Sequence, residues 1–319
     1  MAVITSLLNG IPVDIVLSNE DRFKSLADTP KPVRCKFCGK ELPFEGIYWK
    51  DTHKIEWSKK PMNCDCIGFQ KESSRIRLEK IKAFELREKL ACIKRIKNDS
   101  GLCKREFDRS FSNFIENDAN HDAKEKAYQY ASNFTKKIMN FNKPQTPTEK
   151  FSLYIYGNVG LGKTHLASAV ANYLINEEVK VVFTSISDLL QKIRQTFNSS
   201  DSDYIFESEV TEKYISCDLL IIDDFGKDKS TDWSVSKVFE IINKRYENYK
   251  PMIITSNYSL GNLEKRLTPS NTFDCISAQA VVDRLYEMCY EICLSGDSFR
   301  KKPIQTQSIS NRIGGGYGY

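Results

Sequence analysis

The sequence predicts an α/β protein in which helices cover both faces of a parallel β-sheet, preceded by a small domain that contains a helix. Three observations lead to this fold class. A glycine-rich loop lies between an apolar run and a helical pattern, at residues 157–164. After it, short β-rich runs alternate with helical stretches, and two close cysteine pairs precede it near the N-terminus. We expect residues 1–98 to form the N-terminal domain with its linker helix, 99–305 the α/β domain, and 306–319 a flexible tail.

Composition and charge narrow the class of protein. The chain has 319 residues, of which 40% are hydrophobic, and this suffices for about two domains with a sizeable core. The formal net charge of +5 is weakly basic, so contact with nucleic acid requires a local patch. The sequence has no apolar run of about 18 residues, so we expect no membrane-spanning helix. It begins without a basic leader and has ten cysteines, and we expect a reducing, cytoplasmic location.

A phosphate-binding loop is the most informative motif of the chain. Residues 157–164 read G-N-V-G-L-G-K-T, a pattern whose backbone N–H groups surround the phosphates of a nucleotide. Lys163 would reach the β- and γ-phosphates, and Thr164 would hold Mg²⁺. The apolar run at 151–156 predicts a buried strand before the loop, and apolar residues every four positions from Leu166 predict a helix after it. The candidate nucleotide-binding residues are Gly157, Asn158, Val159, Gly160, Leu161, Gly162, Lys163, Thr164 and His165.

A second motif predicts the acidic part of the same site. Four apolar residues at 219–222 form a predicted buried strand that ends in Asp223 and Asp224. We assign Mg²⁺ coordination through a water to Asp223, and the orientation or deprotonation of an attacking water to Asp224. Many ATPases of this type carry Glu at the second position. Because Asp is one methylene shorter, its carboxylate needs a closer water or a slightly displaced strand.

Three further polar residues are candidates for contact with the γ-phosphate. Asn257 follows a predicted strand at 252–255, and the carboxyl ends of parallel strands are where open α/β sheets bind ligands. Arg284 lies in a predicted helix, and Arg300 ends the tetrapeptide D-S-F-R. Guanidinium groups stabilise charge on the γ-phosphoryl oxygens, from the same subunit or a neighbouring one. A further predicted strand, at 180–184, completes the alternating pattern.

Taken together, these motifs resemble those of the AAA+ ATPases of the DnaC/DnaI helicase-loader group, which includes the IstB transposition helpers. The segments in order are G-N-V-G-L-G-K-T, L-L-I-I-D-D-F-G, T-S-N, V-V-D-R-L and S-F-R. The resemblance covers about residues 100–300, and the segment G-L-C-K-R-E-F-D-R-S-F-S-N-F is similar to the lead-in of that family.

This resemblance implies roles for the polar residues and for assembly. It implies that Asn257 is the first sensor, that Arg284 is an arginine finger for the ATP of the next subunit, and that Arg300 contacts phosphate in its own subunit. It also implies ATP-dependent assembly of subunits into a spiral around single-stranded DNA. By the same resemblance, residues 186–214 would face the pore. The candidates for phosphate contact are Lys192, Arg194 and Lys213, and those for base stacking are Phe197, Tyr204 and Phe206.

The cysteine pairs predict a structural zinc site. Cys35 and Cys38 form a C-x-x-C, and Cys64 and Cys66 follow 25 residues later with one residue between them. Two close pairs can converge on one tetrahedral zinc ion. Two alternatives stay open at this point, namely a site in which His53 replaces one cysteine and a segment without metal. A segment of this size holds no core unaided, so the zinc would be structural.

The predicted function is ATP-dependent loading of a hexameric replicative helicase onto single-stranded DNA in replication initiation, with ATP hydrolysis dependent on Mg²⁺. Some loaders of the group resemble this layout, with a cysteine-rich N-terminal module that docks on the helicase. A charged run at 69–98 without Gly or Pro predicts a long helix, either a partner surface or a solvated connector, and a further helix is expected at 122–139. Two alternative functions remain, an IstB-like transposition helper and a DNA-binding adaptor that its nucleotide switches with little turnover.

Overall fold

The computed structural model describes residues 13–24, 26, 28–138, 150–196, 207–268 and 276–300. The chain divides into two compact units, Met1–Glu88 and Lys89–Tyr319, and the division falls inside one helix, α2 (Ile67–Asp99). No described helix is long and apolar enough to cross a bilayer.

The N-terminal unit is built on a small antiparallel sheet. Its strand order is β1-β4-β5, and a separate two-stranded hairpin of β2 and β3 flanks the first cysteine pair in sequence. The strands are β1 (Val13–Leu17), β2 (Val33–Arg34), β3 (Glu41–Leu42), β4 (Phe44–Trp49) and β5 (Lys54–Pro61). The sequence predicted only a compact cysteine-bearing segment here. Few described residues of this unit are buried, among them Val16, Phe23 and Leu42.

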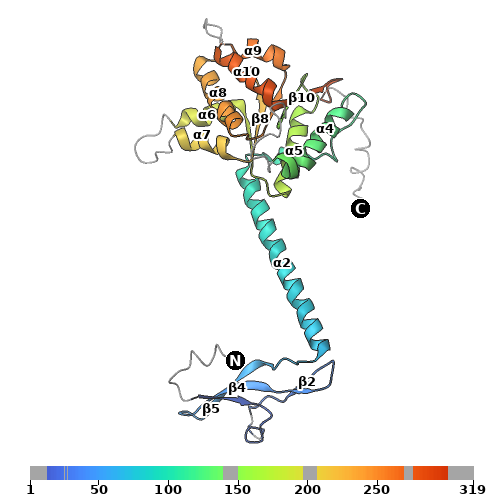
Figure 1. Ribbon diagram of the computed structural model, residues 1–319, viewed down its shortest axis with the longest axis vertical. Coiled ribbons are helices and arrows are strands. Elements are labelled where there is room, and N and C mark those ends of the chain that lie inside the picture. Colours follow the sequence, from blue (N-terminus) through green and yellow to red (C-terminus); the bar gives the residue numbers. More distant parts are fainter. Residues whose placement is uncertain are drawn as a thin grey trace, which may run out of the picture. The chain divides into compact units, whose positions relative to one another are not determined.

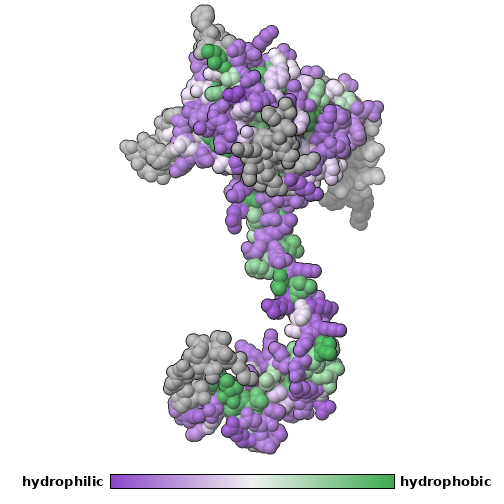
Figure 2. Space-filling view, viewed as in Figure 1, coloured by the Kyte–Doolittle hydropathy of each residue, from purple (hydrophilic) through white to green (hydrophobic). Residues whose placement is uncertain are grey.

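Helix α2 follows the cysteines and is the long helix expected at 69–98. It contains 33 residues and ends before Ser100 and Gly101, whose φ of +78° ends the helical path. Its exposed surface mixes apolar and charged side chains, and on the face seen in Figure 2 hydrophobic patches are interrupted by hydrophilic ones. The apolar residues exposed on α2 include Ile76, Leu78, Ile81, Phe84, Leu86 and Leu90.

The second unit contains a five-stranded parallel sheet in the order β10-β6-β9-β8-β7 (Figure 1). The strands are β6 (Ser152–Gly157), β7 (Val181–Ser185), β8 (Leu219–Phe225), β9 (Met252–Ser256) and β10 (Cys289–Leu294). The four predicted strands are therefore confirmed with small shifts of their ends, except that β8 extends three residues further and includes both aspartates. β10 was not predicted, and it makes β6 an interior strand.

Helices cover both faces of this sheet, as the sequence predicted (Figure 1). One face packs against α6 (Ile186–Gln195), α7 (Glu207–Ser216), α8 (Asp232–Glu247), α9 (Leu260–Leu267) and α10 (Ile276–Met288). The other face packs against α4 (His121–Asn133), α5 (Lys163–Asn176) and the last turns of α2. The strands alternate between the two cores. Tyr154 and Ile254 face the first, whereas Leu153, Ile155 and Ile253 face the second.

The lead-in to the sheet differs from the expected single helix at 122–139. α4 begins at His121 and gives way to a π-helix, Phe134–Ile138, after Asn133. A short helix, α3 (Lys104–Phe107), precedes it. The segment is tied to α5, because Asn172 donates hydrogen bonds of 2.8 Å to the carbonyls of Glu106 and Arg109. The predicted loop at 142–147 and tail at 306–319 lie outside the described residues.

Candidate nucleotide site

The phosphate loop connects β6 to α5 at the carboxyl edge of the sheet. Gly157 has a φ of +146°, and a Cβ there would lie 2.2 Å from the carbonyl oxygen of Leu294 in β10. Gly160 has a φ of +87°, and a Cβ there would collide with the Ser298 side chain. Both positions therefore require glycine, for close approach and for backbone conformation. The N–H groups at the start of α5 are the donors that such a loop offers to phosphate.

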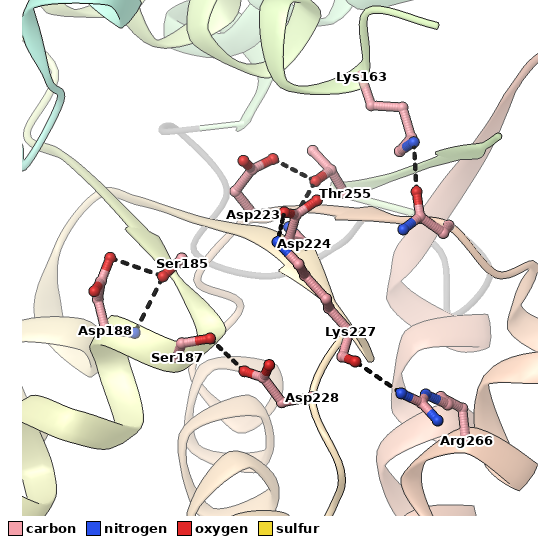
Figure 3. Close-up of polar contacts among 11 residues, drawn as sticks. Lys163, Ser185, Ser187, Asp188, Asp223, Asp224, Lys227, Asp228, Thr255 and Arg266 are labelled. Carbon is pink, nitrogen blue, oxygen red and sulfur yellow. Dashed lines mark hydrogen bonds and ion pairs between the residues drawn. The ribbon is translucent and has the colours of Figure 1, made fainter. Parts of the chain in front are cut away.

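Lys163 is buried at the start of α5 and holds the loop closed on itself. Its Nζ donates to the carbonyls of Gly157 at 2.8 Å and Asn158 at 2.9 Å. It also donates to Oδ1 of Asn257 at 2.8 Å, the dashed line from Lys163 in Figure 3. Burial lowers the pKa of Lys163, and the carboxylates of Asp224 and Asp223 oppose this shift. A triphosphate in front of the loop would supply the negative charge that a buried ammonium needs.

The two aspartates share one threonine of the neighbouring strand. Thr255 Oγ1 donates to Oδ1 of Asp223 at 2.5 Å and accepts from the N–H of Asp224 at 3.0 Å (Figure 3). Burial raises the pKa of Asp223, and the hydrogen bond from Thr255 opposes the rise. The nearby Thr164 side chain also acts to lower the pKa of Asp223. A hydroxyl and a largely buried carboxylate close to each other fit an Mg²⁺ site of the predicted kind, in which Thr164 would bind the ion and Asp223 would hold it through a water.

Asp224 lies at an irregularity of β8. The register of β8 against β9 shifts between Ile222 and Phe225, and Asp224 adopts a left-handed φ of +57°. Its carboxylate lies 3.0 Å from Nζ of Lys227, which is three residues further on. The strand end is therefore irregular at Asp224, and its carboxylate is paired with a lysine that is close in sequence.

These residues line one cavity of about 690 Å³. It contains Lys163, Thr164, Asp223, Asp224 and Asn257, together with Arg300 and His165, so the structure brings most of the predicted site residues together. Three further predicted loop residues, Val159, Gly160 and Gly162, also line it, whereas Gly157, Asn158 and the buried Leu161 do not.

Arg284 lies elsewhere. It is on α10, where its Nε donates to Asn243 at 3.3 Å and its guanidinium lies 4.7 Å from the ring centroid of Tyr246. It does not line the cavity of its own chain. Its role as a finger for a neighbouring subunit stays a prediction.

Sequence reasoning missed one wall of the cavity. Arg105, Asp108, Arg109, Phe114 and Ile115, all from the lead-in segment, line it. The ring of Phe114 packs edge-on against His165 at 5.2 Å between centroids, and a Cβ at Gly162 would lie 2.9 Å from Phe114. Only the likeness of the lead-in to other family members pointed to this segment. Its position depends on contacts across some 50 residues of sequence, as in the hydrogen bond from Arg109 to Ser168 at 3.3 Å.

The four cysteines of the N-terminal unit form a group that fits zinc. Their Sγ atoms all lie within 4.8 Å of one another, with Cys35–Cys66 at 3.7 Å and Cys38–Cys64 at 3.5 Å. A tetrahedral ion with Zn–S bonds of about 2.3 Å places its sulfurs about 3.8 Å apart. Backbone N–H groups of Phe37 and Cys38 lower the pKa of Cys35 to about 6, whereas burial and the neighbouring cysteines raise the pKa of Cys64 against the backbone hydrogen bond from Cys66. Cys35 is therefore the member of the group that most favours the thiolate form that binds metal.

His53 is not part of this group. Its Nδ1 lies 2.7 Å from the hydroxyl of Tyr48, and it lies in the turn between β4 and β5. The alternative in which His53 replaces a cysteine is therefore wrong.

Part of the predicted DNA surface is described. Lys192 and Arg194 on α6 and Lys213 on α7 are exposed, and the Arg194 guanidinium lies 4.8 Å from the ring centroid of Trp233. Phe197, Tyr204 and Phe206 lie outside the described residues. The predicted DNA contacts of all six stay predictions.

The parallel sheet, the phosphate loop and the acidic strand end define a P-loop AAA+ ATP-binding protein. The family model described as IstB-like ATP binding protein matches residues 108–307, and the chain belongs to that family.

Curated relatives extend the match. The replicative helicase loader DnaC of Buchnera aphidicola subsp. Baizongia pistaciae is 25% identical over 240 residues, covering 75% of this chain and 87% of the relative. The chromosomal replication initiator protein DnaA of Francisella tularensis subsp. novicida is 31% identical over 162 residues, which are 49% of this chain and 30% of DnaA. Among solved structures, a DnaC helicase loader is similar with a TM-score of 0.48 at 24% identity, covering 60% of this chain and 100% of that one.

Proposed function

We propose that the protein hydrolyses ATP and uses it to load a hexameric replicative helicase onto single-stranded DNA in replication initiation. The observation that carries the proposal is the single cavity in which Lys163, Asp223, Asp224 and Arg300 converge. The relatives support the loader role, because the DnaC of Buchnera aphidicola matches this chain over most of both lengths. The location would be the cytoplasm, where such a helicase acts.

Each side chain of the cavity has a role in this proposal. Lys163 and the loop N–H groups bind the β- and γ-phosphates, and Thr164 and Asp223 hold Mg²⁺, which supplies charge neutralisation when it is bound. Asp224 accepts the proton of the attacking water, and Asn257, 2.8 Å from Lys163, orients that water or the γ-phosphate. Arg300 stabilises the charge that develops on the γ-phosphoryl oxygens.

The N-terminal unit would select the partner. Its four cysteines fit a structural zinc ion, and this module would dock on the helicase while the ATPase unit acts on it. A second candidate function is assistance of a transposase. It is favoured by the description of the matching family, which is named for IstB. Binding to purified replicative helicase, but not to transposase, is the expected result, and the reverse preference would establish the second function.

Hydrolysis is tested directly by the rate of phosphate release with and without single-stranded DNA. We expect the parent to turn over ATP with Mg²⁺ and Asp223→Asn to lose at least about a hundredfold in rate, because it loses the carboxylate that holds the ion. Equal rates near zero for both proteins would instead identify a nucleotide-switched adaptor with little turnover.

The assignment of Arg284 is tested by mixing two inactive variants. Arg284→Ala should bind ATP and fail to hydrolyse it, and Lys163→Ala should fail to bind it. If Arg284 completes the site of a neighbour, the mixture regains activity, because a Lys163→Ala subunit offers its intact arginine to the intact nucleotide site of an Arg284→Ala subunit. A mixture that stays inactive, or an Arg284→Ala protein of full rate, contradicts the shared site.

A further inference from the structure

The turn that follows β8 is fixed to α9 by one arginine. Nε of Arg266 donates to the carbonyl of Gly226 at 2.8 Å. Nη2 donates to the carbonyl of Lys227 at 2.7 Å, as Figure 3 shows. The guanidinium lies 5.7 Å from the ring centroid of Tyr258. A Cβ at Gly226 would lie 3.0 Å from Leu263 and 3.5 Å from Arg266, so the turn and α9 are in close contact.

The same turn places the ammonium group of Lys227 beside the carboxylate of Asp224. The N–H of Lys227 donates to the carbonyl of Asp224 at 3.2 Å, and its Nζ lies 3.0 Å from Oδ2 of the same residue. The Asp224 carboxylate raises the pKa of Lys227. Lys227 lines the cavity that contains Lys163 and Asn257. Two contacts therefore hold Asp224 in place. Thr255 accepts a hydrogen bond from its backbone N–H, and Lys227 donates one to its carboxylate.

We propose that Arg266 is a positioning residue for Asp224, acting through the Gly226–Lys227 turn and the ion pair that Lys227 makes. The inference rests on the ATP hydrolysis proposed above. Hydrogen bonds from a charged guanidinium are stronger than those between neutral groups, and two from one planar group fix an orientation. Because α9 begins three residues after Asn257, one short segment carries both Asn257 and the residue that aims Asp224.

The direction of the effect follows from the geometry. The left-handed conformation of Asp224 is held by its surroundings, so loss of the turn would let the carboxylate rotate away from the water. A misplacement of about 1 Å at a reacting group costs up to about a hundredfold in rate. Nucleotide affinity depends on the phosphate loop and should not change.

The test compares kcat and KM for ATP in Arg266→Ala, Arg266→Lys and Lys265→Ala. The last variant removes the same charge from the exposed neighbouring position on α9. We expect Arg266→Ala to lose at least about tenfold in kcat with KM within about twofold of the parent, and Arg266→Lys to recover part of the loss by donating one hydrogen bond. Lys265→Ala should match the parent.

A second pair of variants tests the same path without touching α9. Lys227→Ala should lower kcat at unchanged KM, whereas Lys229→Ala, an exposed lysine two residues further on, should not. In a double-mutant cycle the losses of Arg266→Ala and Lys227→Ala should be less than additive, because both act on one carboxylate. These variants also decide the question if Arg266→Ala fails to fold.

Two outcomes overturn the inference. One is parent-like kcat in Arg266→Ala, and the other is fully additive losses in the cycle. A parent protein without any ATP turnover refutes the proposed function instead, so the two failures are distinguishable.

Discussion

The nucleotide-binding unit buries both faces of its central sheet, whereas the N-terminal sheet leaves most of its side chains exposed or half-buried. Leu219, Leu220, Ile221 and Ile222 of β8 are each at most 1% exposed, but the eight residues of β5 include no fully buried one. Burial of apolar area at about 25 cal/mol per Å² stabilises the nucleotide-binding unit. The N-terminal unit needs another source of folding free energy, and zinc bound by its four converging cysteines would provide one. The comparison predicts that the two units fail under different treatments.

Removal of zinc should produce the largest effect, confined to the N-terminal unit. Structural zinc contributes on the order of 10 kcal/mol to the folding of small modules. We expect one zinc per chain by metal analysis, and we expect chelation or Cys64→Ser to make residues 13–88 sensitive to protease while ATP binding persists. Cys103→Ser, at an exposed cysteine of the other unit, is the control. A protein that contains no zinc and resists chelators would break the comparison.

Loss of Arg245 should produce the next largest effect, in the nucleotide-binding unit. This fully buried side chain donates to the carbonyls of Tyr214, Cys217 and Pro251 at 2.7, 3.1 and 2.5 Å, and so links the end of α7 to the starts of β8 and β9. Arg245→Met removes the charged donor from these carbonyls and leaves Pro251 with only the longer hydrogen bond from the N–H of Leu220 at 3.4 Å, so the free energy of unfolding should fall by about 3 kcal/mol.

Denaturant unfolding of the parent and of Lys244→Met, at the exposed neighbouring position, provides the comparison. The control should stay within about 0.5 kcal/mol of the parent. An equal, small change in both variants would show that the buried cation is dispensable.

Nucleotide should stabilise only the unit that contains the cavity. At a hundred times its dissociation constant a ligand adds about 2.7 kcal/mol to the free energy of unfolding. We expect Mg·ATP to raise the unfolding midpoint of the parent, and Lys163→Ala to abolish this rise because it removes the main charge that faces the phosphates. Calorimetry with and without Mg·ATP measures both. An unchanged response in Lys163→Ala would contradict the site.

The smallest predicted effect concerns Asp223 and pH. Because burial raises the pKa of Asp223 above its value in the unfolded chain, this carboxyl favours the folded state only while it is protonated. As pH rises from the unfolded to the folded pKa of Asp223, the carboxyl ionises less readily in the folded state, and the free energy of unfolding falls. Asp223→Asn should therefore stabilise the nucleotide-free protein at about pH 8, and the gain should shrink as pH falls toward the ordinary aspartate pKa of about 3.9. A gain that is independent of pH would mean that charge is not its cause.

Local patterns in the sequence predicted the parts of the site that depend on neighbouring residues. The loop at 157–164 and the strand end at Asp223 could be predicted because each lies directly after a short apolar run. The glycines, the lysine and the carboxylates that follow these runs are residue types typical of a phosphate and magnesium site. β10 was missed because its six residues at the edge of the sheet mix buried and exposed positions without regular alternation and follow a helix without a break. The cavity wall around Phe114 depends on contacts with α5, far along the chain, which local periodicity does not encode.

The N-terminal sheet was missed for a related reason. Trp49 and Trp57 lie on strands that carry many charged and half-exposed residues, so their pattern did not stand out from that of a loop. The buried position of Arg245 was equally hidden, since an arginine among the charged residues of α8 gives no sign that it faces inward.

The backbone at Asp224 limits which amino acids this position can accept. Asp and Asn tolerate positive φ better than longer or branched side chains do. Replacement by Glu would lengthen the side chain and also strain the backbone at this positive φ. It would therefore not simply restore the arrangement of ATPases that carry Glu at this position. Position 224 is therefore constrained twice, by the need for a proton acceptor and by the left-handed backbone conformation. Asp at this position and Glu in other ATPases are two separate structural solutions, and one cannot simply replace the other.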